Sequence, residues 1–127
     1  MAYDEFLVDR IRQVLNEKKT SFEEKKMMGS LCFMVNEKMC IGVNIDKTTG
    51  TSRIVGRVGD KVYENALKKK ICSEFNITGR AMKGFVYVSA EGIDMQEDLE
   101  YWIQLCLDYN PLAKKSKKKT NVRPIKI

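Results

Sequence analysis

Side chains that could carry out chemistry are few in this 127-residue sequence. Histidine, the commonest general base and metal ligand, does not occur. The acidic pairs Glu23-Glu24 and Glu97-Asp98 are sequence neighbours, and neighbouring side chains diverge on a strand or a helix. Because no grouping of acid, base and nucleophile can be named, the sequence predicts a protein that is not an enzyme and needs no cofactor.

The cysteines do not indicate a metal site. Cys32, Cys40, Cys72 and Cys106 lack the Cys-x-x-Cys spacing that is typical of zinc sites. Their neighbours are mostly apolar, and a free cysteine commonly packs as a small hydrophobic residue. We therefore expect buried, unreactive thiols.

The segment from Gly79 to Gly84 has the glycine spacing of a phosphate-binding loop. Phe85-Val86 stands where such a loop requires Lys-Ser or Lys-Thr, so the motif is incomplete. Arg80 and Lys83 lie in this segment and are candidates for contact with a phosphate or an acidic partner. The alternative is that both are solvated or paired with a nearby acid.

The strongest basic feature is the C-terminal tail. Seven basic residues and no acidic residue follow Leu112. Six of them are the predicted nucleic-acid contacts: Lys114, Lys115, Lys117, Lys118, Lys119 and Arg123. A lysine run neutralises phosphates without reading base sequence, and it would also be attracted to an anionic membrane surface. The alternative is a merely solubilising end, and the tail has no aromatic residue that could stack on bases.

Three helices are predicted to position these features. Apolar residues recur at spacings of three and four over residues 3–17: Tyr3, Phe6, Leu7, Ile11, Val14 and Leu15. A second helix should run from a cap at Asp60 to about Lys70, and a third from a capping box at Asp94–Glu97 to about Tyr109. The third helix is expected to bury four side chains: Leu99, Trp102, Ile103 and Cys106.

Strands are predicted over Phe22–Met28, Leu31–Val35, Met39–Ile45, Arg53–Val58 and Phe85–Val88. The last is apolar on both faces, which favours an inner strand over an edge strand. Asn36-Glu37-Lys38 is the expected turn of a hairpin. With an even number of loop residues, Phe33 would share a face with Cys40, and Ile41 would lie on the opposite face. A three-residue loop would reverse this assignment.

The order of elements predicts an α+β fold, with an antiparallel sheet of about five strands flanked by N-terminal, middle and C-terminal helices. We expect one domain over residues 1–112 and a basic, disordered tail over residues 113–127. The first residues include Asp4 and Glu5 and are unlike a signal peptide, and no apolar run is long enough to span a membrane. The expected location is therefore the cytoplasm.

Several motifs together are distinctive. They are Met1–Glu5, Glu24–Gly29, Leu31–Asn36, Met39–Val43, Arg57–Gly59 and Tyr63-Glu64. The most specific ones follow: Phe75, Thr78–Arg80, Met82–Gly84, Phe85–Val88 and Glu91-Gly92, with Trp102 in the last helix. Over about residues 1–110 the sequence thereby resembles the N-terminal domain of the TfoX/Sxy family.

This resemblance implies a compact α+β domain with an antiparallel sheet. Better-known members regulate natural competence in bacteria, as transcription co-activators with a cyclic-AMP receptor protein. They carry a second, C-terminal domain that has no counterpart in this sequence, and the family supplies no catalytic residues. Here Asn36-Glu37 replaces the usual Asn-Gly turn, and Gly56 stands where an apolar strand residue is usual.

Three hypotheses follow. The leading one is a non-enzymatic bacterial interaction domain in transcription regulation, whose body binds a protein such as a transcription factor and whose tail binds nucleic acid. The second is a small-ligand-binding or enzymatic module that uses the Gly79–Gly84 turn with Arg80 and Lys83. The third is a homodimer in which a second copy covers an apolar face of the sheet.

Overall fold

The computed structural model describes residues 4–27, 30–46, 48–76 and 81–113. Its helices are α1 (Glu5–Glu17), α2 (Asp60–Leu67) and α3 (Gln96–Tyr109), with short 3-10 turns at Ala90–Gly92 and Asn110–Leu112. Its strands are β1 (Glu23–Met27), β2 (Ser30–Val35), β3 (Lys38–Ile45), β4 (Ser52–Arg57), β5 (Cys72–Asn76) and β6 (Ala81–Val88). Within these residues, no helix has the length and apolar character needed to cross a membrane.

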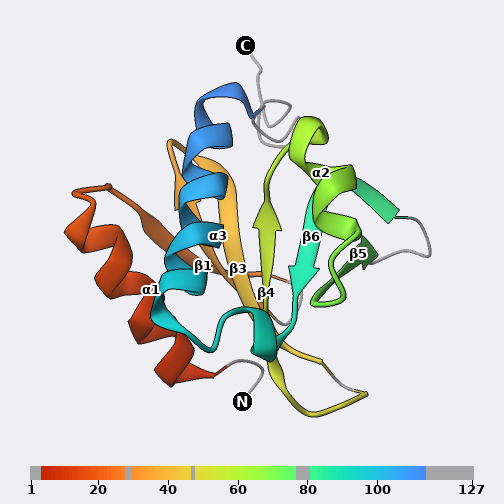
Figure 1. The fold of residues 1–127 in the computed structure, drawn as a ribbon. Helices are drawn as coiled ribbons and strands as arrows, with labels where there is room; N and C mark the ends of the chain where they lie inside the picture. The colour runs from red at the N-terminus through yellow and green to blue at the C-terminus, as the bar shows by residue number, and fades with distance from the viewer. Residues whose placement is uncertain (1–3, 28–29, 47, 77–80, 114–127) are drawn as a thin grey trace.

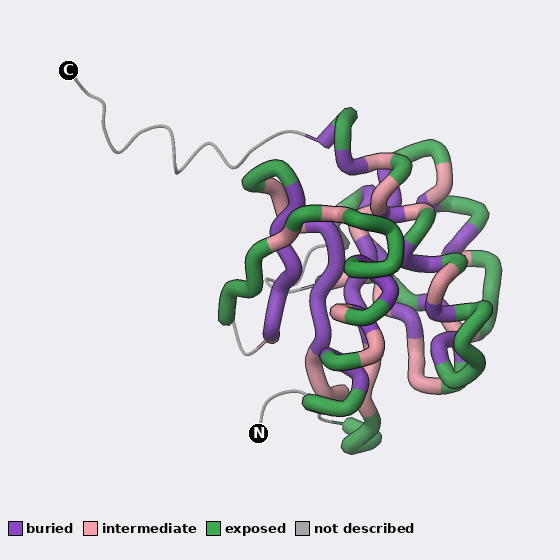
Figure 2. The backbone as a smooth tube through the Cα atoms, turned by 90° about the vertical axis from the view of Figure 1, so that its left-hand side faces the viewer, coloured by how far each residue is buried: buried purple, intermediate pink, exposed green. Residues whose placement is uncertain are grey.

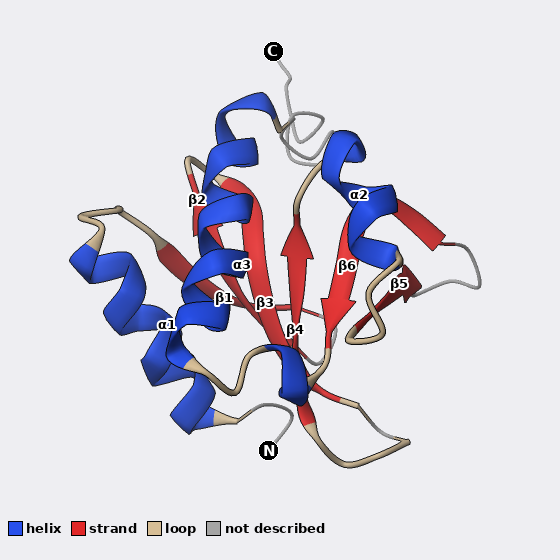
Figure 3. Ribbon diagram, in the orientation of Figure 1, coloured by secondary structure: helices blue, strands red, loops and turns tan. Residues whose placement is uncertain are grey.

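The elements form two layers. Figure 1 shows α1, α3 and α2 side by side in front of the sheet, and Figure 3 separates the layers by colour. The other face of the sheet carries no helix among the described residues. This is the predicted α+β class.

All the strand pairs are antiparallel, and the strand order is β1-β2-β3-β4-β6-β5. The sheet therefore has six strands rather than about five. The additional strand, β5, lies at the edge and follows α2 directly. β6 lies between β4 and β5, so the prediction of an inner strand at Phe85–Val88 is confirmed. It begins earlier than predicted, at Ala81, which places Gly84 inside the strand and not in a turn before it.

The hairpin between β2 and β3 has an even, two-residue turn at Asn36-Glu37, where both residues adopt positive φ (54° and 65°). However, the register shifts between Phe33 and Met34, so that Phe33 pairs with Ile41 and Met34 with Met39. This bulge brings both Cys40 and Ile41 into the core. The prediction that Ile41 faces away from Phe33 was therefore wrong, because a regular pleat cannot anticipate an inserted residue.

The core lies between the helices and the sheet. Its largest fully buried side chains include Phe33, Ile11, Leu15, Ile41, Ile54, Leu99 and Ile103. Figure 2 shows buried backbone, in purple, running along the middle of the strands. The predicted buried face of α3 is confirmed at all four positions. In α1, Phe6 belongs to the predicted apolar pattern but is 75% exposed, while Val8, which is not part of that pattern, is buried.

The helices begin differently from the prediction. Asp4, which was expected inside the first turn, is the N-cap of α1, and its carboxylate accepts hydrogen bonds from the backbone N–H groups of Phe6 and Leu7. α2 is capped by Gly59, so Asp60 is its first residue and not its cap. α3 begins after Met95 without a side-chain cap, so the predicted capping box does not form.

Two glycines allow the start of α2 to meet β6. Gly59 and Gly84 both adopt positive φ, 87° and 93°, which is unfavourable for residues with a Cβ atom. The carbonyl oxygen of Gly84 accepts hydrogen bonds from the N–H groups of Val58 (2.8 Å) and Gly59 (3.1 Å). The ring of Tyr109 packs against Gly59 so closely that a Cβ atom there would lie 2.4 Å from its Cδ1 atom.

A buried amide joins the end of α3 to the β2–β3 hairpin. Asn110 is 2% exposed and is the only buried polar or charged residue among those described. Its Nδ2 donates to the carbonyl oxygen of Val35 (3.1 Å), and its Oδ1 accepts from Nδ2 of Asn36 (2.8 Å). The ammonium group of Lys38 donates to the carbonyl oxygen of Asn110 (2.9 Å). These bonds satisfy the buried amide and fix the hairpin turn against the helical layer.

Candidate functional site

The sheet face that carries no helix presents side chains from β4 and β6. Arg57 pairs with Phe85 and Val55 pairs with Tyr87, and paired residues point to the same side of a sheet. The alternate residues of β4 and β6, such as Ile54, belong to the core under the helices. Arginine and aromatic side chains are thereby placed together on the open face.

Three aromatic rings are in contact on this face. The ring of Phe75, from edge strand β5, lies 5.7 Å from the ring of Phe85 and 5.2 Å from that of Tyr87, between centroids. All three side chains are half-buried. These spacings are those of favourable edge and tilted ring contacts, so the rings form one joined surface.

Two guanidinium groups complete this surface. The guanidinium carbon of Arg53 lies 3.5 Å from the ring centroid of Tyr87, and that of Arg57 lies 5.2 Å from the ring centroid of Phe85. Nε of Arg53 donates to Oδ1 of Asn44 (2.8 Å), and its Nη1 lies 3.4 Å from Oδ2 of Asp46. These contacts orient the guanidinium plane over the ring. We call Phe75, Phe85, Tyr87, Arg53 and Arg57 the Arg–aromatic cluster.

Most of the residues that the sequence nominated for binding are not in this cluster. Lys83 is exposed in β6, two positions before Phe85. Arg80, Gly79 and all the nominated tail residues from Lys114 to Arg123 lie outside the described residues. Gly84 uses its carbonyl group internally, on Val58 and Gly59, which gives this glycine a role in the fold.

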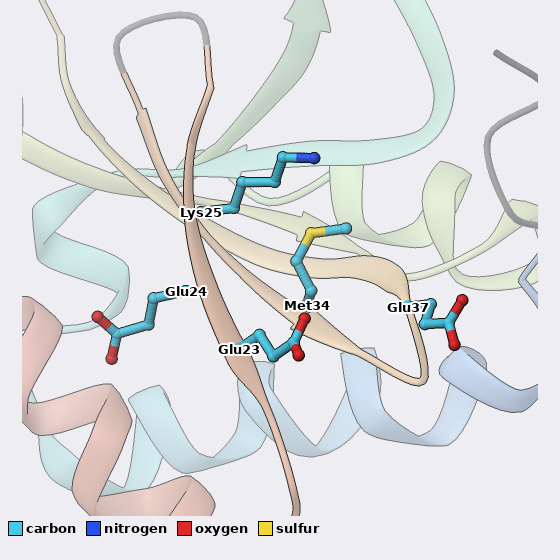
Figure 4. A pocket seen from close by; sticks show the side chains of 5 residues that line it. All are labelled: Glu23, Glu24, Lys25, Met34 and Glu37. Atoms are coloured by element: carbon cyan, nitrogen blue, oxygen red, sulfur yellow. The ribbon is translucent and has the colours of Figure 1, made fainter. Parts of the chain in front are cut away.

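A depression of about 320 Å³ lies at the opposite end of the sheet. Glu23, Glu24, Lys25, Met34 and Glu37 line it, and Figure 4 shows that their side chains diverge. The carboxylate of Glu24 is bound by the guanidinium group of Arg12, which lowers its pKa. An acidic rim with divergent side chains is not a built ligand site.

The described part of the chain contains no group of side chains that could form a metal site. No three His, Cys, Asp or Glu side chains there are close enough to share a metal ion. The prediction of buried thiols is confirmed, since all four cysteines are buried and free. Burial raises the pKa of Cys40 to about 12 and that of Cys72 to about 11, so these thiols stay protonated at neutral pH.

The thiols of the folded protein are expected to react with an alkylating reagent at about pH 8 far more slowly than those of the denatured protein, in which all four should react. A thiol that reacts equally fast in both states would contradict this expectation.

Burial of the thiols also makes the stability of the fold depend on pH. The thiols of the unfolded chain ionise at about pH 8.5, whereas those of Cys40 and Cys72 in the folded protein keep their protons to a higher pH. The free energy of unfolding should therefore fall as the pH rises from about 9 towards 12.

Sequence reasoning found only part of the cluster. The pattern Phe85-x-Tyr87 already placed two rings on one strand face. Arg53 and Arg57 were assigned to a strand but not to a site, although their spacing of four puts them on one face of that strand. Phe75 could not be placed, because β5 was not predicted as a separate strand.

Comparison with known families gives one match. The profile described as the TfoX N-terminal domain matches residues 15–109. This range contains every helix and strand except most of α1, and it includes the whole Arg–aromatic cluster. No curated protein matches the chain at a significant level.

Proposed function

The chain belongs to the TfoX N-terminal domain family, and on this premise we propose that it is a non-enzymatic regulatory module that acts in the bacterial cytoplasm. Its body binds a partner protein, and its basic tail holds nucleic acid. The family is associated with competence and with regulation, so transcription control is the activity that fits this module.

The observation that best supports an interaction module is the open sheet face with its Arg–aromatic cluster. Small-molecule sites are concave and enclose most of their ligand. A sheet face is instead a broad surface, and exposed arginine and aromatic side chains are enriched where macromolecules bind. This face therefore favours a macromolecular ligand over a small substrate.

The helical layer offers a separate surface for a protein. Phe6 in α1 is 75% exposed, and Met95 before α3 is 56% exposed. The middle of α1 lies beside the segment that precedes α3, since Nη2 of Arg10 donates to the carbonyl oxygen of Asp94 (3.2 Å). Phe and Met are among the residues that are enriched at protein interfaces, which favours protein contact on this layer. The proposed partner is a transcription factor, as for the better-known members of the family.

The tail is tested by changing five lysines to glutamine in the full chain: Lys114, Lys115, Lys117, Lys118 and Lys119. Removing one phosphate-neutralising lysine should reduce the slope of log affinity against log salt by about 0.9 for duplex DNA. Fluorescence anisotropy of a labelled duplex across a salt series measures this slope. We expect the variant to bind weakly, with a much shallower slope.

A matched control changes five exposed lysines of the body to glutamine: Lys19, Lys61, Lys68, Lys69 and Lys70. This control removes the same charge, so general electrostatic attraction falls equally in both variants. A tail variant that keeps the slope of the unmodified protein, or that behaves like the control, would remove the nucleic-acid role from the tail.

A further inference from the structure

We propose that the Arg–aromatic cluster is a binding platform for single-stranded nucleic acid. Bases would stack on its rings and guanidinium planes, and its cations would contact phosphates. This inference deepens the nucleic-acid part of the proposed function, and it does not depend on the tail or on a protein partner.

The rings supply the surface that unpaired bases require. Phe75 on β5 contacts both rings of the neighbouring strand β6, Phe85 at 5.7 Å and Tyr87 at 5.2 Å between centroids. Stacking on aromatic side chains of a sheet is a general way to hold two or three unpaired bases, because every base has a π face. A joined surface of three rings on an uncovered sheet matches this requirement.

The guanidinium groups extend the same surface. Arg53 lies flat enough over Tyr87 to reach 3.5 Å from its centroid, and its contacts with Asn44 and Asp46 keep it there. The Arg53 side chain is still 21% exposed. The outer side of a guanidinium plane stacks well on a base, and its N–H groups bind phosphate oxygens. A lysine in the same place would keep the charge but lose the planar contact.

The charges of the open face are separated along the sheet. The two guanidinium groups lie on β4, with the carboxylate of Asp46 3.4 Å from Arg53. The depression beside β1 and the β2–β3 turn is instead lined by three glutamates and one lysine: Glu23, Glu24, Glu37 and Lys25. The cluster end therefore suits a polyanion. An isologous dimer centred on the cluster would bring like guanidinium charges together, which disfavours a second copy as the occupant. Duplex DNA hides the π faces of its bases, so a single strand should be preferred.

The test measures binding of the full chain to a labelled oligothymidine and to a labelled duplex of equal length, by fluorescence anisotropy. Arg53→Lys keeps the charge, and Phe75→Leu keeps an apolar side chain on the edge strand, so both variants should fold. Each is expected to weaken single-strand binding about 5- to 30-fold and to leave duplex binding within about twofold. Arg10→Lys, on the helical side, is the matched control and should change neither.

Three binding results would overturn the platform. The unmodified chain could bind both probes equally, the two variants could bind the single strand like the unmodified chain, or they could lose both probes to the same extent. A dimer that dissociates in the variants, seen by light scattering, would also overturn it by making the face a self-interface. The five-lysine tail variant separates the two proposals. If its slope of log duplex affinity against log salt is unchanged, the tail does not bind nucleic acid. The platform is still supported if Arg53→Lys and Phe75→Leu reduce the preference for the single strand over the duplex.

Discussion

Replacing Gly59 with alanine is expected to lower the free energy of unfolding by about 3–5 kcal/mol. The backbone at Gly59 has a φ of 87°, and a Cβ atom would lie 2.4 Å from Cδ1 of Tyr109. A strained φ and an overlap each cost about 1–3 kcal/mol, and here they act at the same residue. Relief would require Tyr109 to move, or the hydrogen bond between Gly59 and Gly84 to break.

Urea denaturation monitored by the fluorescence of Trp102 measures this change. Gly50→Ala is the matched control, since Gly50 also has positive φ (74°) but a Cβ atom there would have no neighbouring atom within 4 Å. The control should cost about 1 kcal/mol, because only the backbone conformation is unfavourable. Equal losses in the two variants would show that the contact with Tyr109 does not restrict Gly59.

Replacing Asn110 with alanine is expected to cost about 2–4 kcal/mol. The substitution removes the donor to the buried carbonyl group of Val35 and the acceptor for Asn36. A buried polar group left without a partner costs about 1–3 kcal/mol, and the hairpin turn also loses its attachment to α3. Because the backbone carbonyl group of Asn110 remains, the hydrogen bond from Lys38 can persist.

Asn65→Ala provides the comparison, since Asn65 is exposed in α2. This control should change the free energy of unfolding by less than about 0.5 kcal/mol. Equilibrium denaturation of both variants under the same conditions gives the difference. A loss below about 1 kcal/mol for Asn110→Ala would mean that water or a neighbouring group replaces the amide, and the hairpin would not depend on this residue.

Periodicity predicted the helices and most strands because it reports which side chains face the core. The spacing of Leu99, Trp102, Ile103 and Cys106 specified the buried face of α3 without any tertiary information. The same reasoning failed at Phe6, because an apolar residue near the start of a helix can extend beyond the layer that the helix covers. The family resemblance and the matched profile agree on the α+β domain.

Local chemistry was a weaker guide to the ends of the elements. Asp60 and the Asp94–Glu97 motif have the composition of caps, yet Gly59 and Met95 occupy the cap positions. The bulge at Cys40 shifts by one residue which β3 side chains point to the core, and this shift depends on how β3 pairs with β2. Such features depend on contacts between distant segments, so a single sequence cannot specify them.

The candidate site illustrates the same limit. Phe85 and Tyr87 were visible as one face of a strand, because they are neighbours in sequence. Arg53, Arg57 and Phe75 join them only through the strand order β4-β6-β5, which the sequence pattern did not determine. The nominated cations at Arg80 and in the tail remain predictions, since they lie outside the described residues.

The position of β6 between β4 and β5 has a consequence for how the chain assembles during synthesis. The first four strands pair with sequence neighbours, so this meander can form on the nascent chain as soon as β4 emerges. β5 and β6 follow each other in the chain and can pair as a second hairpin. β6 must also pair with β4, with Val88 opposite Ile54, across a segment that contains α2 and β5. The docking of this second hairpin onto β4 joins the most distant strands of the sheet, and it is the step expected to limit the folding rate.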